Sequence, residues 1–210
     1  MKPKAEAAVR PVILRVPEDD YLPLPPRDRV RFLSRYARRA LIASAGFRGV
    51  ILLPGELKNE TSGRPFPLPG GYWSISHKPR YVAGVFSSEP VGIDLEKIRL
   101  YNVHLRPKTA GEEEWRLVDP DLPESFFRFW TAKEAVLKIG GAGIAHLLKC
   151  RVTHIQDDQR LLVRYQETEY RVRHVYFDGH VAAVVEGSCP VRWALPDDLD
   201  SEGAGSGQGE

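Results

Sequence analysis

Apolar residues recur with helical spacing in one early segment of the chain. Val30, Leu33, Ala37 and Leu41 would line one face of a helix that begins after Pro26. Shorter apolar runs and alternating patterns predict strands, which we place at residues 12–16, 72–76, 81–86 and 91–96. The first part of the chain therefore combines one long helix with several strands.

A similar combination follows in the second part. Residues 107–117 have a mixed helical pattern. A longer helix is predicted over residues 126–139 and ends at Gly140-Gly141; before it, Asp121 and Glu124 form a pair resembling a capping box, with Pro123 in the first turn. The rest is rich in β pattern, with strands predicted at residues 161–165, 170–177 and 180–185. Between the last two, Asp178-Gly179 is a strong signal for a hairpin turn.

One short segment recurs along the chain. Val82-Ala83-Gly84-Val85 precedes Val181-Ala182-Ala183-Val184 by 99 residues, and a proline ends the turn after each segment. We take this as a hint of two similar α+β halves, and place them at residues 1–98 and 99–196. The remaining residues 197–210 have almost nothing apolar to bury, and we expect them to be disordered.

Composition excludes several classes of protein. Of the 210 residues 42% are hydrophobic and 28% charged, which is typical of a folded protein. The net charge of +2 is too small to indicate bulk attraction to nucleic acid or to a membrane. The two cysteines form no CxxC pair, which argues against a disulfide scaffold. With no apolar run near the roughly 20 residues of a membrane span and no signal peptide, we expect a cytoplasmic protein.

Two acidic residues in the predicted strand 91–96 could bind a metal. Asp94 and Glu96 are two residues apart, so their side chains share a face of the strand. Carboxylates of this kind suit Mg²⁺, although two solvated surface acids are the commoner explanation of such a pair. Glu134 and Lys138 share a helix face, either as a surface ion pair or, if that face meets the strand, as a third carboxylate and a phosphate-binding lysine.

Two other segments could bind phosphate. Ser74-Ile75-Ser76-His77 offers two hydroxyl groups on one face and an imidazole at the start of a turn, or simply a turn with a solvated histidine. Six arginines lie between Arg27 and Arg39, and they form either a solvated basic face or a site for phosphate or an acidic partner.

Five segments, four of them core motifs in a characteristic order, resemble those of one enzyme family. They are Ser34-Arg35-Tyr36-Ala37-Arg38, Gly63-Arg64-Pro65, Ser74-Ile75-Ser76-His77, Gly92-Ile93-Asp94-Leu95-Glu96, and Trp130-Thr131-Ala132-Lys133-Glu134-Ala135 with Lys138. The chain resembles the 4′-phosphopantetheinyl transferases of the large monomeric type, which activate carrier proteins of peptide and polyketide synthases and of siderophore assembly. The resemblance implies an α+β pseudo-dimer of two similar halves, with the active site between them.

The resemblance also implies a reaction. Such enzymes transfer 4′-phosphopantetheine from coenzyme A to a serine of an acyl or peptidyl carrier protein, and they release adenosine 3′,5′-bisphosphate. By resemblance, Asp94, Glu96 and Glu134 hold Mg²⁺ on the pyrophosphate of coenzyme A, and Lys138 neutralises charge on the leaving phosphate. No nucleic-acid or membrane partner is expected.

Residues that contact coenzyme A are implied in the same way. Ser76 and His77 would meet its phosphates, whereas Arg64, together with Arg31 or Arg35, would meet the adenylate end or its 3′-phosphate.

The general base has several candidates. Family members often carry a glutamate four residues before a leucine between the two acidic motifs, and Glu113 stands in that relation to Leu117. We choose Glu113, with Glu112, Glu114 or a water molecule as alternatives; a solvated acidic helix start would also explain the three glutamates.

Two other functions compete with the transferase. One is a non-catalytic module that binds coenzyme A or a nucleotide. The other is a nucleic-acid-binding protein based on the arginine cluster, which the near-neutral charge disfavours.

Overall fold

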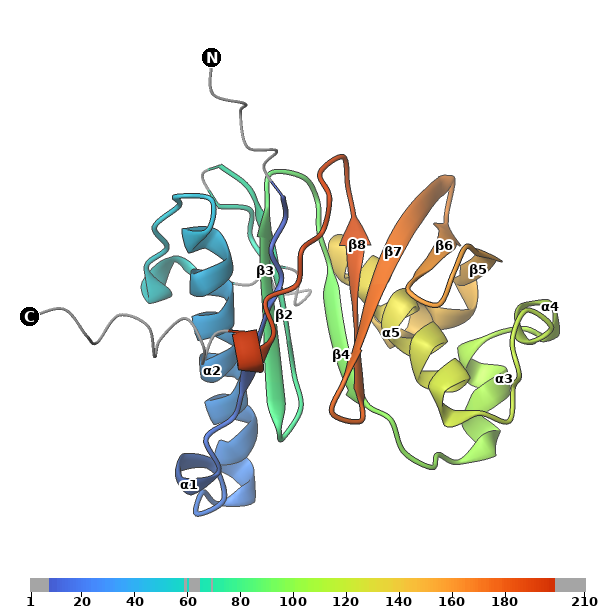
Figure 1. Cartoon of the computed structure of the whole chain (residues 1–210), viewed down its shortest axis with the longest axis horizontal. Coiled ribbons are helices and arrows are strands. Elements are labelled where there is room, and N and C mark those ends of the chain that lie inside the picture. The colour runs from blue at the N-terminus through green and yellow to red at the C-terminus, as the bar shows by residue number, and fades with distance from the viewer. Residues whose placement is uncertain (1–7, 59, 61–64, 69, 199–210) are drawn as a thin grey trace, which may run out of the picture.

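The computed structural model describes residues 8–58, 60, 65–68 and 70–198, and it has two antiparallel sheets, each covered by one long helix (Figure 1). The first sheet has the order β1-β3-β2, formed by Val12–Arg15, Tyr81–Ser87 and Tyr72–His77. The second has the order β4-β8-β7-β6-β5, formed by Ile93–Lys97, His180–Glu186, Thr168–Phe177, Arg160–Tyr165 and Cys150–Ile155.

The long helices are α2 (Pro26–Gly46) and α5 (Pro123–Gly140). The short helices are α1 (Glu18–Tyr21), α3 (Arg106–Thr109) and α4 (Glu112–Trp115), with 3₁₀ turns at Pro54–Glu56, Val103–Leu105 and Ile144–Lys149.

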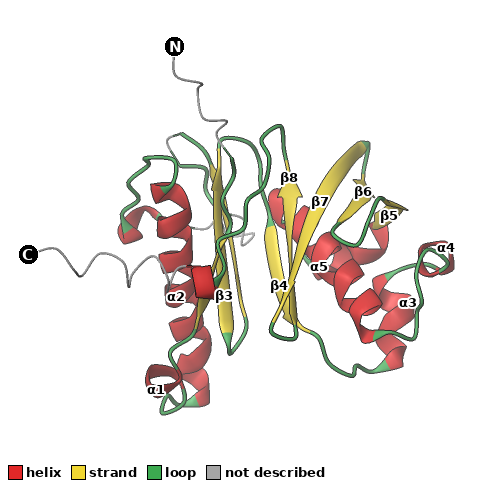
Figure 2. Ribbon diagram, viewed as in Figure 1, coloured by secondary structure: helices red, strands yellow, loops and turns green. Residues whose placement is uncertain are grey.

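The sheets and helices form four layers, with the helices outside and the sheets facing each other (Figure 2). Alternation along each strand explains this arrangement, because successive side chains point to opposite faces. On β3, Val82 packs with α2, whereas its neighbour Ala83 packs in the core between the sheets. On β8, Ala182 and Val184 enter that central core, while Val181 packs with α5. A central apolar layer thus holds the two sheets together, and outer apolar layers hold α2 and α5 on their sheets.

Serine side chains join the two sheets where their edges meet. Strand β2 is at one edge of the first sheet and β4 at one edge of the second. The Ser74 Oγ accepts a hydrogen bond from the Ile93 N–H, and the Ser76 Oγ accepts one from the Leu95 N–H, both at 3.2 Å. These hydroxyls satisfy edge amides that have no backbone partner across the junction. They therefore fix β4 against β2.

Helix α5 lies very close to β4. A Cβ atom added to Gly92, which directly precedes β4, would stand 1.8 Å from the Ala135 carbonyl oxygen, so only glycine permits this packing. The backbone of α5 thus fills the space that the missing side chain of Gly92 leaves beside the acidic residues. The close approach places Glu134 and Lys138 beside the strand.

Most of the predicted elements are present. The α+β class and both long helices are confirmed, as is the hairpin turn, where Asp178 and Gly179 have positive φ angles of 40° and 66°. The capping box was wrong: α5 starts after Leu122 without a side-chain cap, and Asp121 instead accepts a bond from Arg106 at 3.0 Å. Strand β5 was missed, and residues 107–117 contain most of two short helices rather than one.

The division into halves at residue 98 remains a prediction. Strand β4, which precedes that boundary, pairs along its whole length with β8 from the end of the chain. The predicted disordered tail falls mostly on residues 199–210, which lie outside the described part of the chain. Within the described ranges, no helix has the length and apolar character needed to cross a membrane.

Candidate active site

Asp94 is at the centre of a polar cluster formed by β2, β4 and α5. Its Oδ1 atom accepts hydrogen bonds from Ser76 Oγ at 2.9 Å and from Lys138 Nζ at 2.8 Å. Its Oδ2 atom is buried and has no hydrogen-bond partner. A buried carboxylate oxygen without a partner is unusual, since nearly all buried polar atoms are satisfied. The atom is therefore available to a ligand.

Glu96 is the second carboxylate and is also buried. Lys78, from the turn between β2 and β3, contacts its Oε1 atom at 2.6 Å. Burial, and then the charge of Asp94, raise the pKa of Glu96, while Lys78 opposes that rise. Lys78 was not predicted as a site residue, although its position directly after His77 indicates a cation at the same strand end.

Glu134 extends from α5 toward the same two carboxylates. Burial, followed by the charge of Asp94, raises its pKa to about 7, and Lys138 opposes this shift. Of the two arrangements that the sequence left open, the structure has the one in which this helix face lies against the acidic strand, since Lys138 contacts Asp94 at 2.8 Å. Within the described ranges, no three His, Cys, Asp or Glu side chains are arranged to hold a metal ion. Instead, the ammonium group of Lys138 contacts Asp94, and that of Lys78 contacts Glu96.

Lys138 reaches across from α5 to the junction of the sheets. Besides its bond to Asp94, its Nζ donates to the Ile93 carbonyl oxygen at 2.8 Å. Its side chain retains 28% exposure, so the ammonium group is neither fully buried nor a mobile surface charge. The sequence also allowed a simple surface ion pair between Lys138 and Glu134. The contacts of Lys138 with Asp94 and Ile93 differ from such a pair.

His77 ends strand β2 beside this cluster. Its pKa is lowered by burial first, and then by the positive charges of Lys138 and Lys78. This shift favours the neutral form of the imidazole. A neutral ring can still donate one hydrogen bond to a phosphate oxygen.

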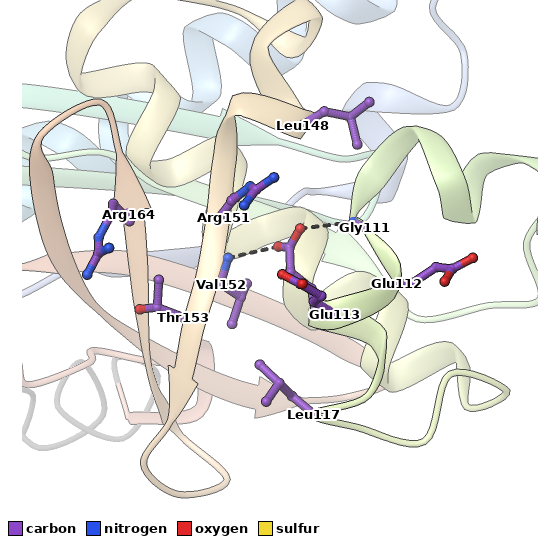
Figure 3. A pocket seen from close by; sticks show the side chains of 10 residues that line it. Gly111, Glu112, Glu113, Leu117, Leu148, Arg151, Val152, Thr153 and Arg164 are labelled. Atoms are coloured by element: carbon purple, nitrogen blue, oxygen red, sulfur yellow. Dashed lines mark hydrogen bonds between the residues drawn. The ribbon is translucent and has the colours of Figure 1, made fainter.

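Glu113 is not part of this cluster. It is exposed and lines a cavity of about 820 Å³ between α4 and β5 (Figure 3). Strands β4 and β5 occupy opposite edges of the five-stranded sheet, so about 19 Å separates them at the usual strand spacing. We therefore correct the choice of Glu113 as general base, because it lies too far from Asp94. Glu112 and Glu114 share α4 and are excluded for the same reason.

Glu114 has a structural role that the sequence analysis did not detect. Its Oε1 accepts hydrogen bonds from the Val152 N–H at 2.8 Å and forms an ion pair with Lys133 at 2.7 Å, while its Oε2 accepts from the Gly111 N–H at 2.9 Å. Figure 3 shows the two backbone bonds as dashed lines. Lys133 neighbours Glu134 in the motif, but adjacent helix residues face different directions. This lysine is fully buried on the side away from the cluster.

The predicted arginine contacts lie elsewhere. Arg31 and Arg35 are exposed on α2, which covers the outer face of the first sheet. Arg35 borders a cavity of about 300 Å³ beside α1, which is also lined by Asp20, Phe32, Tyr36 and Arg39. The structure does not bring these two arginines to Asp94. The prediction for Arg64 concerns a residue outside the described ranges.

Comparison with known proteins gives a consistent assignment. The sequence profile of the 4′-phosphopantetheinyl transferase superfamily matches residues 90–185, which include β4 and α5. The 4′-phosphopantetheinyl transferase psf-1 of Bacillus pumilus is 29% identical over 155 residues, which are 68% of this chain and 66% of that protein. The transferase Sfp of Bacillus subtilis is 26% identical over 63% of this chain and 65% of its own length. A putative 4′-phosphopantetheinyl transferase of Haemophilus influenzae is 31% identical over 66% of this chain and 61% of its own length.

These matches cover slightly less than two thirds of the length of each of the three relatives. They include the strand and the helix that carry the acidic cluster, and the chain has the mixed two-sheet architecture described above. We conclude that the chain belongs to the 4′-phosphopantetheinyl transferase superfamily of enzymes, in the same type as Sfp and psf-1.

Proposed function

We propose that this protein transfers 4′-phosphopantetheine from coenzyme A to a serine of an acyl or peptidyl carrier protein, and that the reaction depends on Mg²⁺. Adenosine 3′,5′-bisphosphate is the second product. The observation that supports this most directly is the buried, unpaired Oδ2 of Asp94, whose other oxygen pairs with Lys138 and whose charge raises the pKa of both Glu96 and Glu134. A cytoplasmic location fits the substrate, and we propose it on that ground.

The residue types and the unpaired Oδ2 atom of Asp94 fit a divalent metal ion, although the three carboxylates do not converge on one point in the arrangement described above. Asp94, Glu96 and Glu134 influence one another's charge, and clustered carboxylates are the ligands that Mg²⁺ prefers. For metal binding, the Lys78 ammonium group has to leave Glu96, and it could then meet a phosphate group. When bound, Mg²⁺ would neutralise charge on the pyrophosphate and polarise its phosphorus–oxygen bonds.

The protein's own residues would orient and stabilise the reacting phosphate. Lys138 carries a positive charge next to Asp94, where it would balance negative charge that develops on the leaving phosphate. His77 would donate a hydrogen bond to another phosphate oxygen. Arg64, together with Arg31 or Arg35, remains proposed for the adenylate end or its 3′-phosphate. The carrier serine attacks the phosphorus atom, and the bond to the nucleotide phosphate breaks. With α4 excluded, we propose water as the acceptor of the serine proton.

The direct test is mass spectrometry of apo carrier proteins from peptide, polyketide and fatty-acid synthases, incubated with coenzyme A, Mg²⁺ and the protein. We expect one or more carriers to gain the mass of phosphopantetheine. Asp94→Asn should abolish the gain while the protein stays folded. The exposed turn variant Glu167→Gln is a matched control, because it also removes one negative charge.

The competing function is binding of coenzyme A without transfer. It would show as calorimetric binding of coenzyme A together with no mass gain on any carrier. That result would overturn the proposed transferase activity of this chain.

A further inference from the structure

We propose that Ser76 is a positioning residue for Asp94, and that the same hydroxyl group joins the two sheets. This inference rests on the proposed function, since Asp94 is there a ligand of Mg²⁺. It differs from the expectation that Ser76 contacts a phosphate of coenzyme A.

The hydrogen bonds of Ser76 determine where its proton points. The Oγ atom accepts from the Leu95 N–H at 3.2 Å and lies 2.9 Å from Asp94 Oδ1. A backbone N–H can only donate and a carboxylate can only accept. The hydroxyl proton must therefore be donated to Asp94. With both bonds formed and only 6% of the residue exposed, the hydroxyl is not free for a phosphate.

This bond fixes which oxygen of Asp94 faces a ligand. Ser76 and Lys138 both donate to Oδ1, from β2 and from α5 respectively. The opposite oxygen, Oδ2, is left buried without a partner. Leaving a buried acceptor unsatisfied is unfavourable, and a cation would remove that cost. Ser76 thus keeps the bare oxygen in the orientation that a metal ion can use.

Ser74 supplies a control within the same strand. It is buried on the same face of β2, and its Oγ accepts from the Ile93 N–H at the same 3.2 Å. Among the hydrogen bonds of the described residues, the Ser74 hydroxyl makes none to a carboxylate. The two serines therefore have the same role in joining the sheets, and they differ in the bond to Asp94.

The experiment compares Ser76→Ala, Ser76→Thr and Ser74→Ala. Metal affinity is measured by titration calorimetry with Mn²⁺ and Mg²⁺, stability by thermal unfolding, and kcat and KM for coenzyme A by the carrier assay. We expect the two alanine variants to lose similar stability. Metal affinity and kcat should fall about tenfold or more in Ser76→Ala, and they should change by less than about twofold in Ser74→Ala. Ser76→Thr, which keeps the hydroxyl, should recover most of the affinity.

Two results would overturn the proposal. One is equal metal affinity in Ser76→Ala and Ser74→Ala. The other is a raised KM for coenzyme A with unchanged kcat and metal affinity in Ser76→Ala, which would indicate a phosphate contact instead. If Ser76→Ala does not fold, Ser76→Cys replaces it, because a thiol is a weak donor of similar size. Failure of the wild-type protein to modify any carrier would refute the proposed function, while the metal titration would still decide the role of Ser76.

Discussion

The Lys133→Met substitution tests whether Lys133, a charged residue of the helix motif, stabilises the fold or takes part in the transfer reaction. The Lys133 side chain is completely buried, and its Nζ contacts Glu114 at 2.7 Å and donates to the Thr109 carbonyl oxygen at 2.8 Å. Burial lowers the pKa of Lys133, while the charge of Glu114 acts to raise it. This ion pair connects α5 to α4, and the Val152 bond of Glu114 extends the connection to β5.

The magnitude follows from the burial of both partners. Methionine fills a similar volume, so the main loss is the charge that neutralises Glu114. Removing one member of a buried ion pair costs about 3–5 kcal/mol of unfolding free energy, because the other charge remains without compensation. In a chain of this size that corresponds to a fall in melting temperature of about 6–20 °C. The double variant Lys133→Met/Glu114→Gln should regain part of the loss.

The measurement is thermal and urea unfolding followed by circular dichroism, with Lys149→Met as the exposed control. At a temperature where the variant is folded, its transfer rate should remain close to that of the wild type. A stability loss below about 1 kcal/mol, or a tenfold fall in kcat with unchanged stability, would refute this reasoning.

Three further predictions concern the acidic cluster. Gly92→Ala should lower the unfolding free energy in urea by about 1–3 kcal/mol, because its Cβ would overlap the Ala135 carbonyl oxygen. Lys138→Ala should lower kcat at least tenfold, about 1.4 kcal/mol of barrier, in steady-state transfer assays. With a chelator present, Glu134 should stabilise the folded state below about pH 4.5, and this contribution should be lost as the pH rises to about 7, since its pKa is raised from 4.5 to about 7 in the folded protein. Glu134→Gln should therefore gain stability relative to the wild type across that pH range in urea titrations, and a constant difference would contradict the pKa shift.

Local sequence pattern was sufficient for many elements of this protein. The helical spacing of apolar residues after Pro26 predicts α2, and Gly140-Gly141 predicts the end of α5. Both signals are local, because side-chain periodicity and the flexibility of glycine act within a few residues. Asp178-Gly179 determines a hairpin for the same reason. The alternation along β4 also places Asp94 and Glu96 on one face before any partner is known.

Only the tertiary structure decided which of these faces meet. Glu113 and Asp94 both resembled site residues, yet strand order puts them at opposite edges of one sheet. Lys133 and Glu134 are adjacent in sequence, yet one is in a buried ion pair and the other faces the acidic cluster. The role of Ser76 depends on a contact between β2 and β4. Sequence periodicity determines the direction of a side chain relative to its own element, whereas the partner depends on how edges and layers pack across long separations in the chain.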